Sequence, residues 1–585
     1  MTVSALAAIA VAVCASTIQA GAQDSSYRVV TSTNDTPVGL PAGNIFIDFG
    51  RPTISEAGEV AFVAVAERAP REFTTALYRE TAGGLALLAA VEQPLPGTGS
   101  ETVWTFSTAS INRGFARGRP QWDELGNAYF FAATGDLNNT APGIWRGGPD
   151  GIVEKVAYAG DPVAGTDLTA TLLAAIPEAG SFSTSEVFDV SSTGRVVYTT
   201  FLNGPGVESS NDRGVVSVSS PGAEPELIVR KGDPVPTRPS ETLDRFGQPF
   251  ITADGTVFVN ARVIGPGITV DTQDRILRKA PGEPVELIFA NNKQLPGFPP
   301  AITMPDLREV FVSDCGSIMF SGFIEGPGIS SDTSSVIFSD RSGNGIELEL
   351  RAGMQVPGFP AGAFYTSLLG FMNDNLTLGF IGGVRETSTT PAFSAFFTEV
   401  GPQPINPAIT IGEGVPGFGP NVTIERFTWA FAIEIVGPAP AFSPAGFPSV
   451  EAEMFDDDLF DEFVLRLTSV GDGPTLAVPL STVIDFPDGP RIVSGSGFDI
   501  DHGINSSSDI AADVGFEDGL EAVVVRSPSP PCVADTNGDG ELNPADFNAW
   551  VRAFNTQAPA CDQNGDGVCN PADFNAWAAN FNAGC

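Results

Sequence analysis

Between residues 23 and 526 the hydrophobic residues fall into short β-branched and aromatic runs, and helical spacing is rare before residue 540. Runs of this length, bounded by Gly, Pro, Asn, Asp and Ser, are typical of β-strands. The chain contains 65 glycines and 48 prolines, as expected where many tight turns join short strands. The pattern therefore predicts an all-β body followed by a short helical segment.

A recurrent turn signal divides this body into units. It reads polar residue, two variable positions, Gly, two variable positions, a small or apolar residue and usually an aromatic one. Copies with the glycine are "SEAGEVAF" from Ser55, "DELGNAYF" from Asp123, "SSTGRVVY" from Ser191, "TADGTVFV" from Thr252 and "SDCGSIMF" from Ser313. Altered copies begin at Asn373, Glu434 and Asn505. Because Gly accepts positive φ and the polar side chain bonds the local backbone, each copy predicts a tight turn leading into a strand.

A second signal, a pair of short strands ending in a Pro-Gly-like turn, alternates with the first. Its eight copies end near Gly43, Gly97, Gly165, Pro236, Gly297, Gly358, Gly417 and Gly489. About four short strands in roughly 60–70 residues is the size of one β-propeller blade. The chain starts inside a unit and ends the body with "EAVVVR" at 521–526, so pairing of the two ends would complete a ring and cover its strand edges. We expect a β-propeller, with eight blades preferred over seven; a string of β-sandwiches and a β-solenoid are the alternatives.

At these turn signals the body, residues 23–526, resembles a family of secreted bacterial proteins with tandem "NxxGxxAF" repeats, and the resemblance covers most of residues 27–526. The resemblance implies an exported or surface protein with a variable C-terminal anchor, and it implies no enzymatic activity.

The charge of the chain excludes some partners. With 70 acidic and 30 basic residues the formal net charge is −40. Phosphate binding depends on Lys and Arg, so nucleic acid and anionic membrane surfaces are not expected partners.

The N-terminus predicts export. An apolar run from Ala5 to Ala15 is too short to span a bilayer, and Ala20-Gly21-Ala22 matches a signal-peptide cleavage pattern, so residues 1–22 are expected to be a signal peptide. No later segment is apolar for long enough to form a transmembrane helix. The mature protein is therefore expected to be secreted, extracellular or associated with the cell surface.

The body contains no recognisable catalytic motif. The single histidine, His502, lacks an accompanying nucleophile motif, and Cys315 is expected to be a half-buried, inert thiol. Arginines recur at equivalent strand positions (Arg79, Arg146, Arg278, Arg466 and Arg526), where pairing with acidic neighbours is favoured over anion binding. The acidic stretch "FDDDLFDEF" at 455–463 is interpreted as a solvated insertion. A non-enzymatic body that binds a protein or glycan is favoured; the alternative is a polysaccharide-active propeller hydrolase or lyase.

A stiff "SPSPP" linker at 527–531 precedes a duplicated segment at 532–585. "DTNGDGELNPADFNAW" at 535–550 returns as "DQNGDGVCNPADFNAW" at 562–577, and both copies have the oxygen-ligand spacing of a calcium loop. The twelve expected ligands of two Ca²⁺ ions are Asp535, Asn537, Asp539, the carbonyl of Glu541, Asn543, Asp546, Asp562, Asn564, Asp566, the carbonyl of Val568, Asn570 and Asp573.

Each loop is followed by a predicted helix. Asn543 and Asn570 are expected N-caps, with Pro544 and Pro571 at the first helical position. Spacing of i, i+3, i+4 and i+7 places one set of apolar residues on one face of each helix: Phe547, Trp550, Val551 and Phe554 in the first, and Phe574, Trp577, Ala578 and Phe581 in the second. These faces are expected to form an aromatic core between the helices.

A duplicated loop and following helix, ending in Gly584-Cys585, resembles a GC-type dockerin. The resemblance implies a cohesin-like or other surface receptor as the partner. Loop positions ten and eleven, which help dockerins select a cohesin, are Pro-Ala in both copies instead of the common Ser-Thr, so the receptor is not expected to be an ordinary cellulosomal cohesin.

Four cysteines of this segment, Cys532, Cys561, Cys569 and Cys585, permit three pairings. In a dockerin the two ends of the module lie together. The resemblance therefore favours Cys532–Cys585 and leaves Cys561–Cys569 as a local disulfide.

Overall fold

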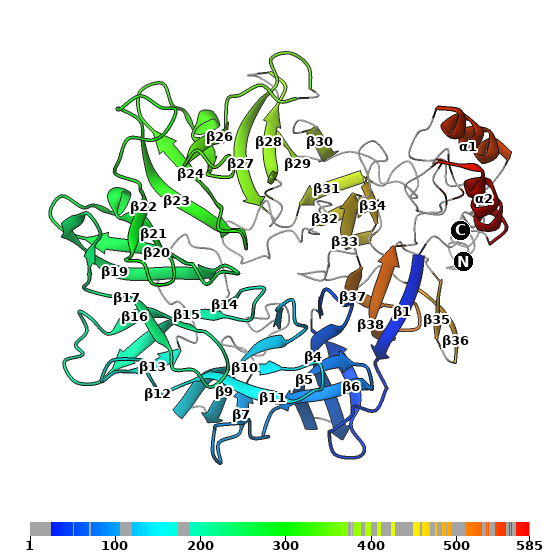
Figure 1. The fold of residues 1–585 in the computed structure, drawn as a ribbon, viewed down its shortest axis with the longest axis horizontal. Helices are drawn as coiled ribbons and strands as arrows, with labels where there is room; N and C mark the ends of the chain where they lie inside the picture. Colours follow the sequence, from blue (N-terminus) through cyan, green and yellow to red (C-terminus); the bar gives the residue numbers. More distant parts are fainter. Residues whose placement is uncertain are drawn as a thin grey trace, which may run out of the picture. The chain divides into compact units, whose positions relative to one another are not determined.

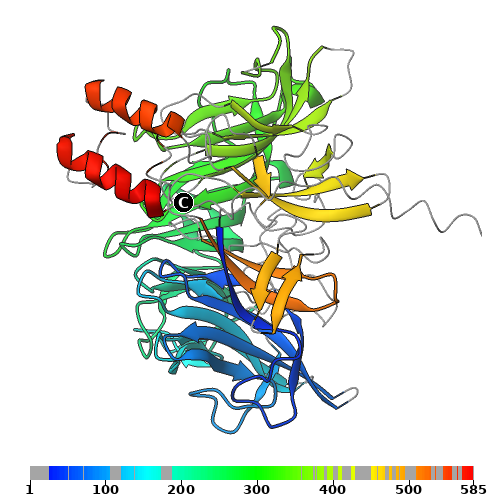
Figure 2. The same cartoon turned by 90° about the vertical axis from the view of Figure 1, so that its right-hand side faces the viewer.

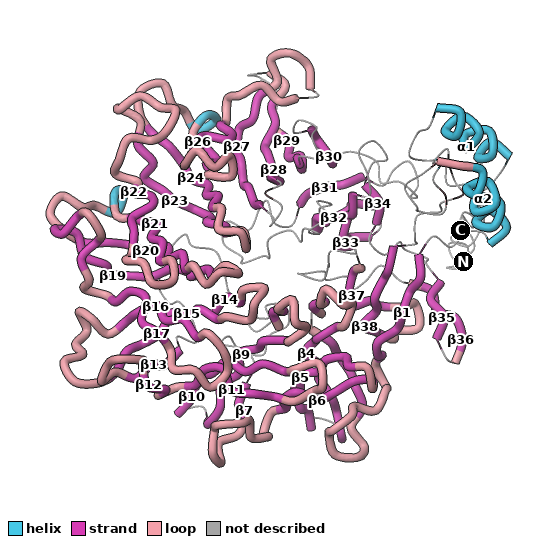
Figure 3. The backbone as a smooth tube through the Cα atoms, in the orientation of Figure 1, coloured by secondary structure: helices cyan, strands magenta, loops and turns pink. Residues whose placement is uncertain are grey.

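The computed structural model of the chain is mostly β (Figures 1 and 3). It describes residues 25–50, 52–69, 72–105, 120–136, 139–172, 188–357, 359–372, 376, 378–387, 392–398, 406–410, 423–427, 449–456, 459–467, 474–476, 483–486, 488–493, 509–528, 534, 536, 544–556, 561, 563 and 569–583. The chain divides into two compact units, one of residues 29–525 and one of residues 1–28 with 526–585. Within the described residues no helix is both long and apolar enough to cross a membrane.

The first three antiparallel sheets of the larger unit follow one another along the chain. The first has strand order β2-β4-β5-β6, the second β11-β10-β9-β7 and the third β12-β13-β15-β16-β17, while the short strands β3, β8 and β14 pair with β4, β9 and β15. Their bounds are β2 Ile45–Phe49, β3 Thr53–Ile54, β4 Val60–Ala69, β5 Glu72–Thr81, β6 Gly84–Ala90, β7 Val103–Thr105, β8 Gln121–Trp122, β9 Ala128–Asp136, β10 Asn139–Gly147, β11 Val153–Tyr158, β12 Asp161–Pro162, β13 Thr169–Leu172, β14 Phe188–Val190, β15 Val196–Asn203, β16 Arg213–Val218 and β17 Glu226–Arg230.

The next three sheets repeat a simple meander, with orders β18-β19-β20-β21-β22, β23-β24-β25-β26 and β27-β28-β29-β30. Their strands are β18 Pro234–Val235, β19 Arg238–Ile251, β20 Val257–Ile264, β21 Asp274–Lys279, β22 Glu286–Ala290, β23 Thr303–Val312, β24 Ile318–Glu325, β25 Ser335–Ser339, β26 Glu347–Arg351, β27 Phe364–Met372, β28 Leu378–Arg385, β29 Phe393–Thr398 and β30 Asn406–Thr410, and the short 3₁₀ turns η1 Val270–Thr272 and η2 Ser331–Thr333 precede β21 and β25.

The remaining strands form a four-stranded meander, a hairpin and a three-stranded sheet of order β1-β38-β37. Their bounds are β31 Thr423–Phe427, β32 Ser449–Asp456, β33 Leu459–Leu467, β34 Pro474–Leu476, β35 Val483–Phe486, β36 Gly489–Ile492, β37 Ile510–Gly515, β38 Glu521–Pro528 and β1 Ser25–Ser32. The acidic stretch 455–463 was expected to be a solvated insertion, but its described residues belong to the paired strands β32 and β33 of a sheet, in which Phe455 pairs with Phe460.

The core of the larger unit lies between successive sheets. Leu77 of β5 packs in one buried cluster with Trp145 of β10, and further clusters join β9–β11 to β15–β16, β15–β17 to β19–β21, and β20–β22 to β23–β25. Val523 of β38 belongs to the cluster of the first sheet. The first five sheets therefore bury apolar residues against their neighbours in chain order, and burial of this kind is the main source of stability for such layers.

The five glycine-containing signals form the same turn. The amide N–H of Ser191 donates to the carbonyl of Arg195 at 2.9 Å, and the amide of Arg195 donates to the Ser191 hydroxyl at 3.1 Å. The same side-chain bond is repeated from Ser55, Asp123, Thr252 and Ser313, and these five polar side chains are buried. Gly194 has φ +79°. The predicted turn chemistry is confirmed at these five positions.

The two ends of the larger unit pair with each other. Strands β1 and β38 are neighbours, and the amide of Thr33 donates to the carbonyl of Glu521 at 2.8 Å. The amide of Glu521 in turn donates to the Thr33 hydroxyl at 3.0 Å. The expected pairing of the first and last parts of the body is therefore present.

The smaller unit contains the two α-helices, α1 Pro544–Thr556 and α2 Pro571–Ala583. They lie side by side in both views (Figures 1 and 2), and Phe547 and Phe574 are in ring contact. Each helix begins at the proline predicted for its first position.

Candidate functional site

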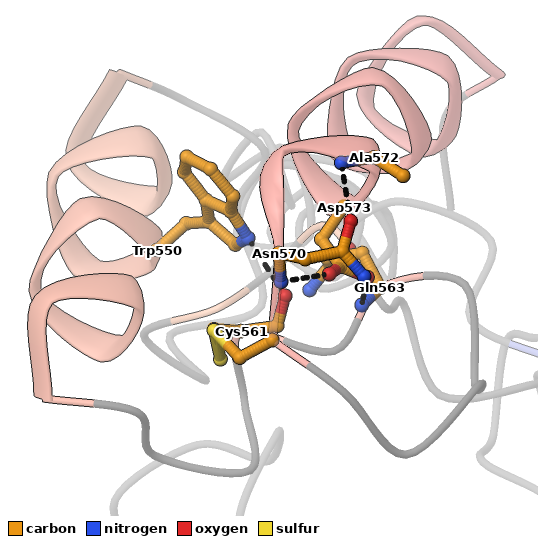
Figure 4. Close-up of a disulfide and its surroundings, with 7 residues drawn as sticks. Trp550, Cys561, Gln563, Asn570, Ala572 and Asp573 are labelled. Atoms are coloured by element: carbon orange, nitrogen blue, oxygen red, sulfur yellow. Dashed lines mark hydrogen bonds between the residues drawn. A yellow bond between two sulfur atoms is a disulfide. The ribbon is translucent and has the colours of Figure 1, made fainter.

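The start of α2 is held by reciprocal hydrogen bonds (Figure 4). The amide of Ala572 donates to Asn570 Oδ1 at 2.8 Å, and the amide of Asn570 donates to Asp573 Oδ2 at 2.7 Å. Asn570 is therefore the N-cap, as predicted, and Asp573 returns the bond from the third helical position.

Asp573 also reaches the beginning of the second loop. Its Oδ1 accepts the amide of Gln563 at 3.0 Å, and its side chain is fully buried. Asp546, at the same position of the first copy, is also fully buried. Loop position twelve thus lies beside position two in the second copy, as is needed for a ligand that closes a calcium loop.

An aromatic core joins the two helices. Trp550 and Trp577 stack with ring centroids 6.3 Å apart, and Phe547 contacts Trp577 at 5.2 Å while Phe574 contacts Trp550 at 5.6 Å. The expected aromatic core is present, but it is not fully enclosed, because Phe547 and Phe574 are 38% and 44% exposed.

The two copies exchange hydrogen bonds. Trp550 of α1 donates its indole N–H to the carbonyl of Cys561 at 3.2 Å, and Trp577 of α2 donates to the carbonyl of Ala534 at 3.2 Å. Cys561 and Ala534 are equivalent residues, each directly before a loop. Each helix therefore holds the start of the other copy's loop.

Cys561 and Cys569 form a disulfide with Cα atoms 5.6 Å apart. This is the local pairing that the resemblance favoured. Cys532 and Cys585 lie outside the described residues, and their pairing stays a prediction.

Three of the twelve expected calcium ligands are described: Asp546, Asn570 and Asp573. The other nine lie outside the described residues: Asp535, Asn537, Asp539, Glu541, Asn543, Asp562, Asn564, Asp566 and Val568. The donor set consists of carboxylate, amide and carbonyl oxygens, which are the ligands that Ca²⁺ prefers. The two described carboxylates, Asp546 and Asp573, are buried at equivalent positions, and their oxygens are of the kind that such a loop uses.

Two of the arginines at equivalent positions, Arg146 and Arg278, pair with acidic neighbours. Arg146 binds Glu154 at 2.7 Å and Arg278 binds Glu286 at 2.6 Å, both at exposed sites. Acid pairing, the favoured reading, is therefore confirmed for these arginines. The Arg466 side chain lies outside the description.

Arg79 differs from the other arginines because it is fully buried. It binds Glu59 and donates to the carbonyls of Gly126 and Gly147 in the next sheet at 2.9 and 2.7 Å. Burial lowers the pKa of its guanidinium, and Glu59 opposes that effect. Sequence pattern alone could not separate this buried bridge between sheets from the exposed pairs.

Sequence reasoning missed a buried charged network in the β18–β22 sheet. Arg275 binds Glu241 at 2.7 Å, and Glu241 also binds Arg238 at 2.9 Å. Asp274 lies 3.3 Å from Arg262, and burial raises the pKa of Asp274 to about 6 although Arg262 opposes the rise. These carboxylates are occupied by arginines of the same network, so their arrangement stabilises the sheet and offers no open acid–base pair.

Cys315 lies in the turn from Ser313 and is exposed, with its Sγ 3.1 Å from the Ser313 hydroxyl. The expectation of a half-buried thiol was wrong, because position three of this turn points to solvent while position one is buried. His502 lies outside the described residues.

The chain belongs to a protein family of unknown function, DUF7453, whose profile matches residues 4–397. No curated protein matches the chain. The match to the family covers most of the sheets and leaves the two helices outside it.

Among solved structures, the chain is similar to one from a study of two prolyl endopeptidases, at 12% identity and TM-score 0.36, covering 76% of this chain and 54% of that one. It is similar to the polysaccharide lyase Uly1 at 9% identity and TM-score 0.35, covering 75% and 94%. A Pyrococcus horikoshii acylaminoacyl peptidase gives 10% identity and TM-score 0.35, covering 80% and 57%. The chain thus spans little more than half of either peptidase, and these scores are too low to transfer any activity.

Proposed function

We propose that this chain is a secreted, non-catalytic protein whose C-terminal module binds two calcium ions and attaches it to a receptor. The receptor is a cohesin-like or other protein at the cell surface or in an extracellular complex. The body serves as a platform for a protein or glycan ligand. Residues 1–22 direct export and are removed.

The observation that carries this proposal is the exchange of bonds between the two copies of the module. Trp550 and Trp577 bind equivalent carbonyls in opposite directions, and Asp546 and Asp573 are equivalent buried carboxylates. A buried carboxylate is costly unless its charge is balanced. In this proposal a calcium ion in each loop adds to that balance, beyond the two backbone amides that Asp573 accepts.

For the body we propose a closed propeller of eight blades. Among the described residues there are eight sheets of three or more strands. Neighbouring sheets share buried clusters in chain order, and β1 pairs with β38. Joining the ends of the chain in one sheet is how such a ring avoids exposed edges.

The receptor contact is proposed to use the exposed start of each helix. Pro571 and Ala572 are exposed, and the equivalent residues of the first copy are also Pro and Ala. In a dockerin these positions select the partner, so the proposed receptor accepts a small apolar pair in place of two hydroxyls.

Calcium titration of the full chain tests the proposal. Isothermal calorimetry is expected to find that the wild-type chain binds two calcium ions. The Asp535→Ala/Asp562→Ala variant should bind neither, and any heat that it still gives measures calcium binding by the body. Equal heats from the two proteins would refute the calcium function. The same preparation can be incubated with polysaccharides and assayed for new reducing ends. If reducing ends appear, the body is an enzyme and the proposal that it is non-catalytic is wrong.

A further inference from the structure

We infer that an exposed apolar patch on the second sheet, formed by Leu125, Pro149 and Ile152, is a docking site for a partner protein that presents a cationic, apolar segment. Leu125 and Ile152 are 69% and 62% exposed, and Pro149 is also exposed. The inference rests on the proposed role of the body as a binding platform. It assigns that role a surface, called the Leu125 patch below, and a chemical class of partner.

Two adjoining loops carry the Leu125 patch. The turn 123–126 leads into β9, and the loop 148–152 joins β10 to β11. A Cβ atom at Gly126 would lie 3.7 Å from Pro149 Cγ, so the two loops are in contact. The exposed apolar residues therefore belong to one continuous surface.

A buried guanidinium fixes these loops from below. Arg79 Nη1 donates to the carbonyl of Gly126 at 2.9 Å and to the carbonyl of Gly147, directly before the second loop, at 2.7 Å. Within that loop the amide of Gly148 donates to the carbonyl of Ile152 at 2.9 Å. Because the loops are held in place without a partner, little conformational entropy is lost when a partner docks.

The fold of the turn does not require a leucine. The four other glycine-containing turns have Ala57, Thr193, Asp254 and Cys315 at the position of Leu125, and they form the same bond from a backbone amide to the first side chain. Single exposed apolar side chains are common on protein surfaces, whereas strongly exposed ones on adjoining loops are a feature of interaction sites. Local structure thus leaves the leucine unexplained, and an interaction accounts for it.

The charge around the Leu125 patch selects the partner. Glu124 and Asp150 are exposed in the two loops, and neither loop contains Lys or Arg. An apolar centre with an acidic rim is complementary to a segment that places apolar side chains between lysines or arginines. A second copy of this chain has a net charge of −40 and would bring further carboxylates, so it fits less well.

Fluorescence anisotropy on the full chain tests the inference. The probe is a labelled, amidated peptide of alternating lysine and leucine residues. A lysine–serine peptide of the same charge measures non-specific attraction to an acidic protein, and a glutamate–leucine peptide tests the sign of the charge. At about 0.15 M salt we expect the lysine–leucine peptide to bind about tenfold more tightly than either of the others.

Variants locate the binding on the surface. Leu125→Ser/Ile152→Ser should lower the affinity for the lysine–leucine peptide about tenfold, to that of the lysine–serine peptide. Val270→Ser changes an apolar residue that is 72% exposed outside the Leu125 patch, and this matched control should alter the affinity by less than about twofold. Melting temperatures near that of the wild type would show that the variants fold.

Equal binding of the lysine–leucine peptide by the wild type and by Leu125→Ser/Ile152→Ser would overturn the inference. Equal affinities of the wild type for the lysine–leucine and glutamate–leucine peptides would overturn it as well. Sedimentation that finds a wild-type dimer, absent in the double variant, would assign the Leu125 patch to a second copy instead. None of these results affects the calcium test, and new reducing ends from polysaccharides would refute the proposed function without involving the Leu125 patch.

Discussion

Trp550 and Trp577 stack with ring centroids 6.3 Å apart, and each donates its indole N–H to a backbone carbonyl of the opposite copy. The acceptors, Cys561 and Ala534, precede the loop of the opposite copy. The stacked pair therefore carries two equivalent bonds in opposite directions, and the copies fold as one unit.

Replacing either tryptophan by phenylalanine should destabilise this unit by a similar amount. Each change keeps an aromatic ring but removes the indole N–H that donates to a backbone carbonyl, so we expect a loss of about 1 kcal/mol for Trp577→Phe and for Trp550→Phe. Urea unfolding followed by near-ultraviolet circular dichroism would measure both. A large effect from one change alone would argue against the twofold arrangement.

Asp274→Asn should change how the stability of the body depends on pH. In the folded chain the pKa of Asp274 is raised from 3.8 to about 6, so between these values the unfolded chain is ionised there while the folded chain is protonated. The unfolded state binds fewer protons, and this group makes stability fall as pH rises from about 4 through 6.

Asparagine does not titrate, so the Asp274→Asn variant lacks this fall in stability with rising pH. The difference in unfolding free energy between variant and wild type should therefore shift in favour of the variant by on the order of 2 kcal/mol from pH 4 to pH 7. Scanning calorimetry at both pH values would show it. Glu286→Gln, at an exposed ion pair, is the control and should change stability little at either pH. A pH-independent difference for Asp274→Asn would contradict the burial argument.

Gly326→Ala should be more harmful than Gly328→Ala in the same loop. Both glycines have positive φ, at +140° and +80°, but a Cβ at Gly326 would lie 2.5 Å from the carbonyl oxygen of Ala301, whereas Gly328 has open space. At Gly328 we expect a loss of about 1–2 kcal/mol in folding stability, because alanine disfavours the left-handed backbone conformation. The loss should be larger at Gly326, because the backbone at Ala301 must also move to make room for the new Cβ. Melting temperatures of the two variants compare the effects directly, and equal losses would mean that the close approach is relieved at no cost.

Asp123→Ala should cost more stability than Ser191→Ala although both residues begin the same turn. The Ser191 hydroxyl accepts one backbone amide, whereas Asp123 accepts the amide and side chain of Asn127 and the hydroxyl of Tyr129. Removing Asp123 leaves several buried donors unpaired, for an expected loss of about 3 kcal/mol against about 1 kcal/mol at Ser191. Denaturant midpoints would rank them, and the reverse order would refute the account of the turn.

The sequence was sufficient where local chemistry decides the structure. The turn at Thr252 follows from one hydroxyl, one glycine and their spacing, and the start of α2 follows from Asn570 and Pro571. The pairing of β1 with β38 was also predictable, because half a repeat stands at each end of the body.

Long-range packing was not predictable in this way. Arg79 and Arg278 look alike in the sequence, yet only the first is enclosed by carbonyls of the next sheet, and that depends on residues about 50–70 positions away. The glycines at 204, 265 and 326 recur at the same interval, and at each of them a neighbouring backbone carbonyl lies too close for a Cβ atom. This recurrence is a signal of close backbone packing that the sequence does contain. The bond from Asn580 to the carbonyl of Gln563 has no such signal, because it joins residues 17 positions apart and any residue can supply a backbone carbonyl.

The bond between Thr33 and Glu521 joins residues 488 positions apart. During synthesis the first strand of the body is made long before its partner exists, and so is the apolar face that Val523 later contacts. Contacts this distant in sequence form late and slowly. The strand 25–32 therefore stays an unpaired edge until residues 510–528 have been made, and the sheet that it completes with β37 and β38 is expected to form late in folding.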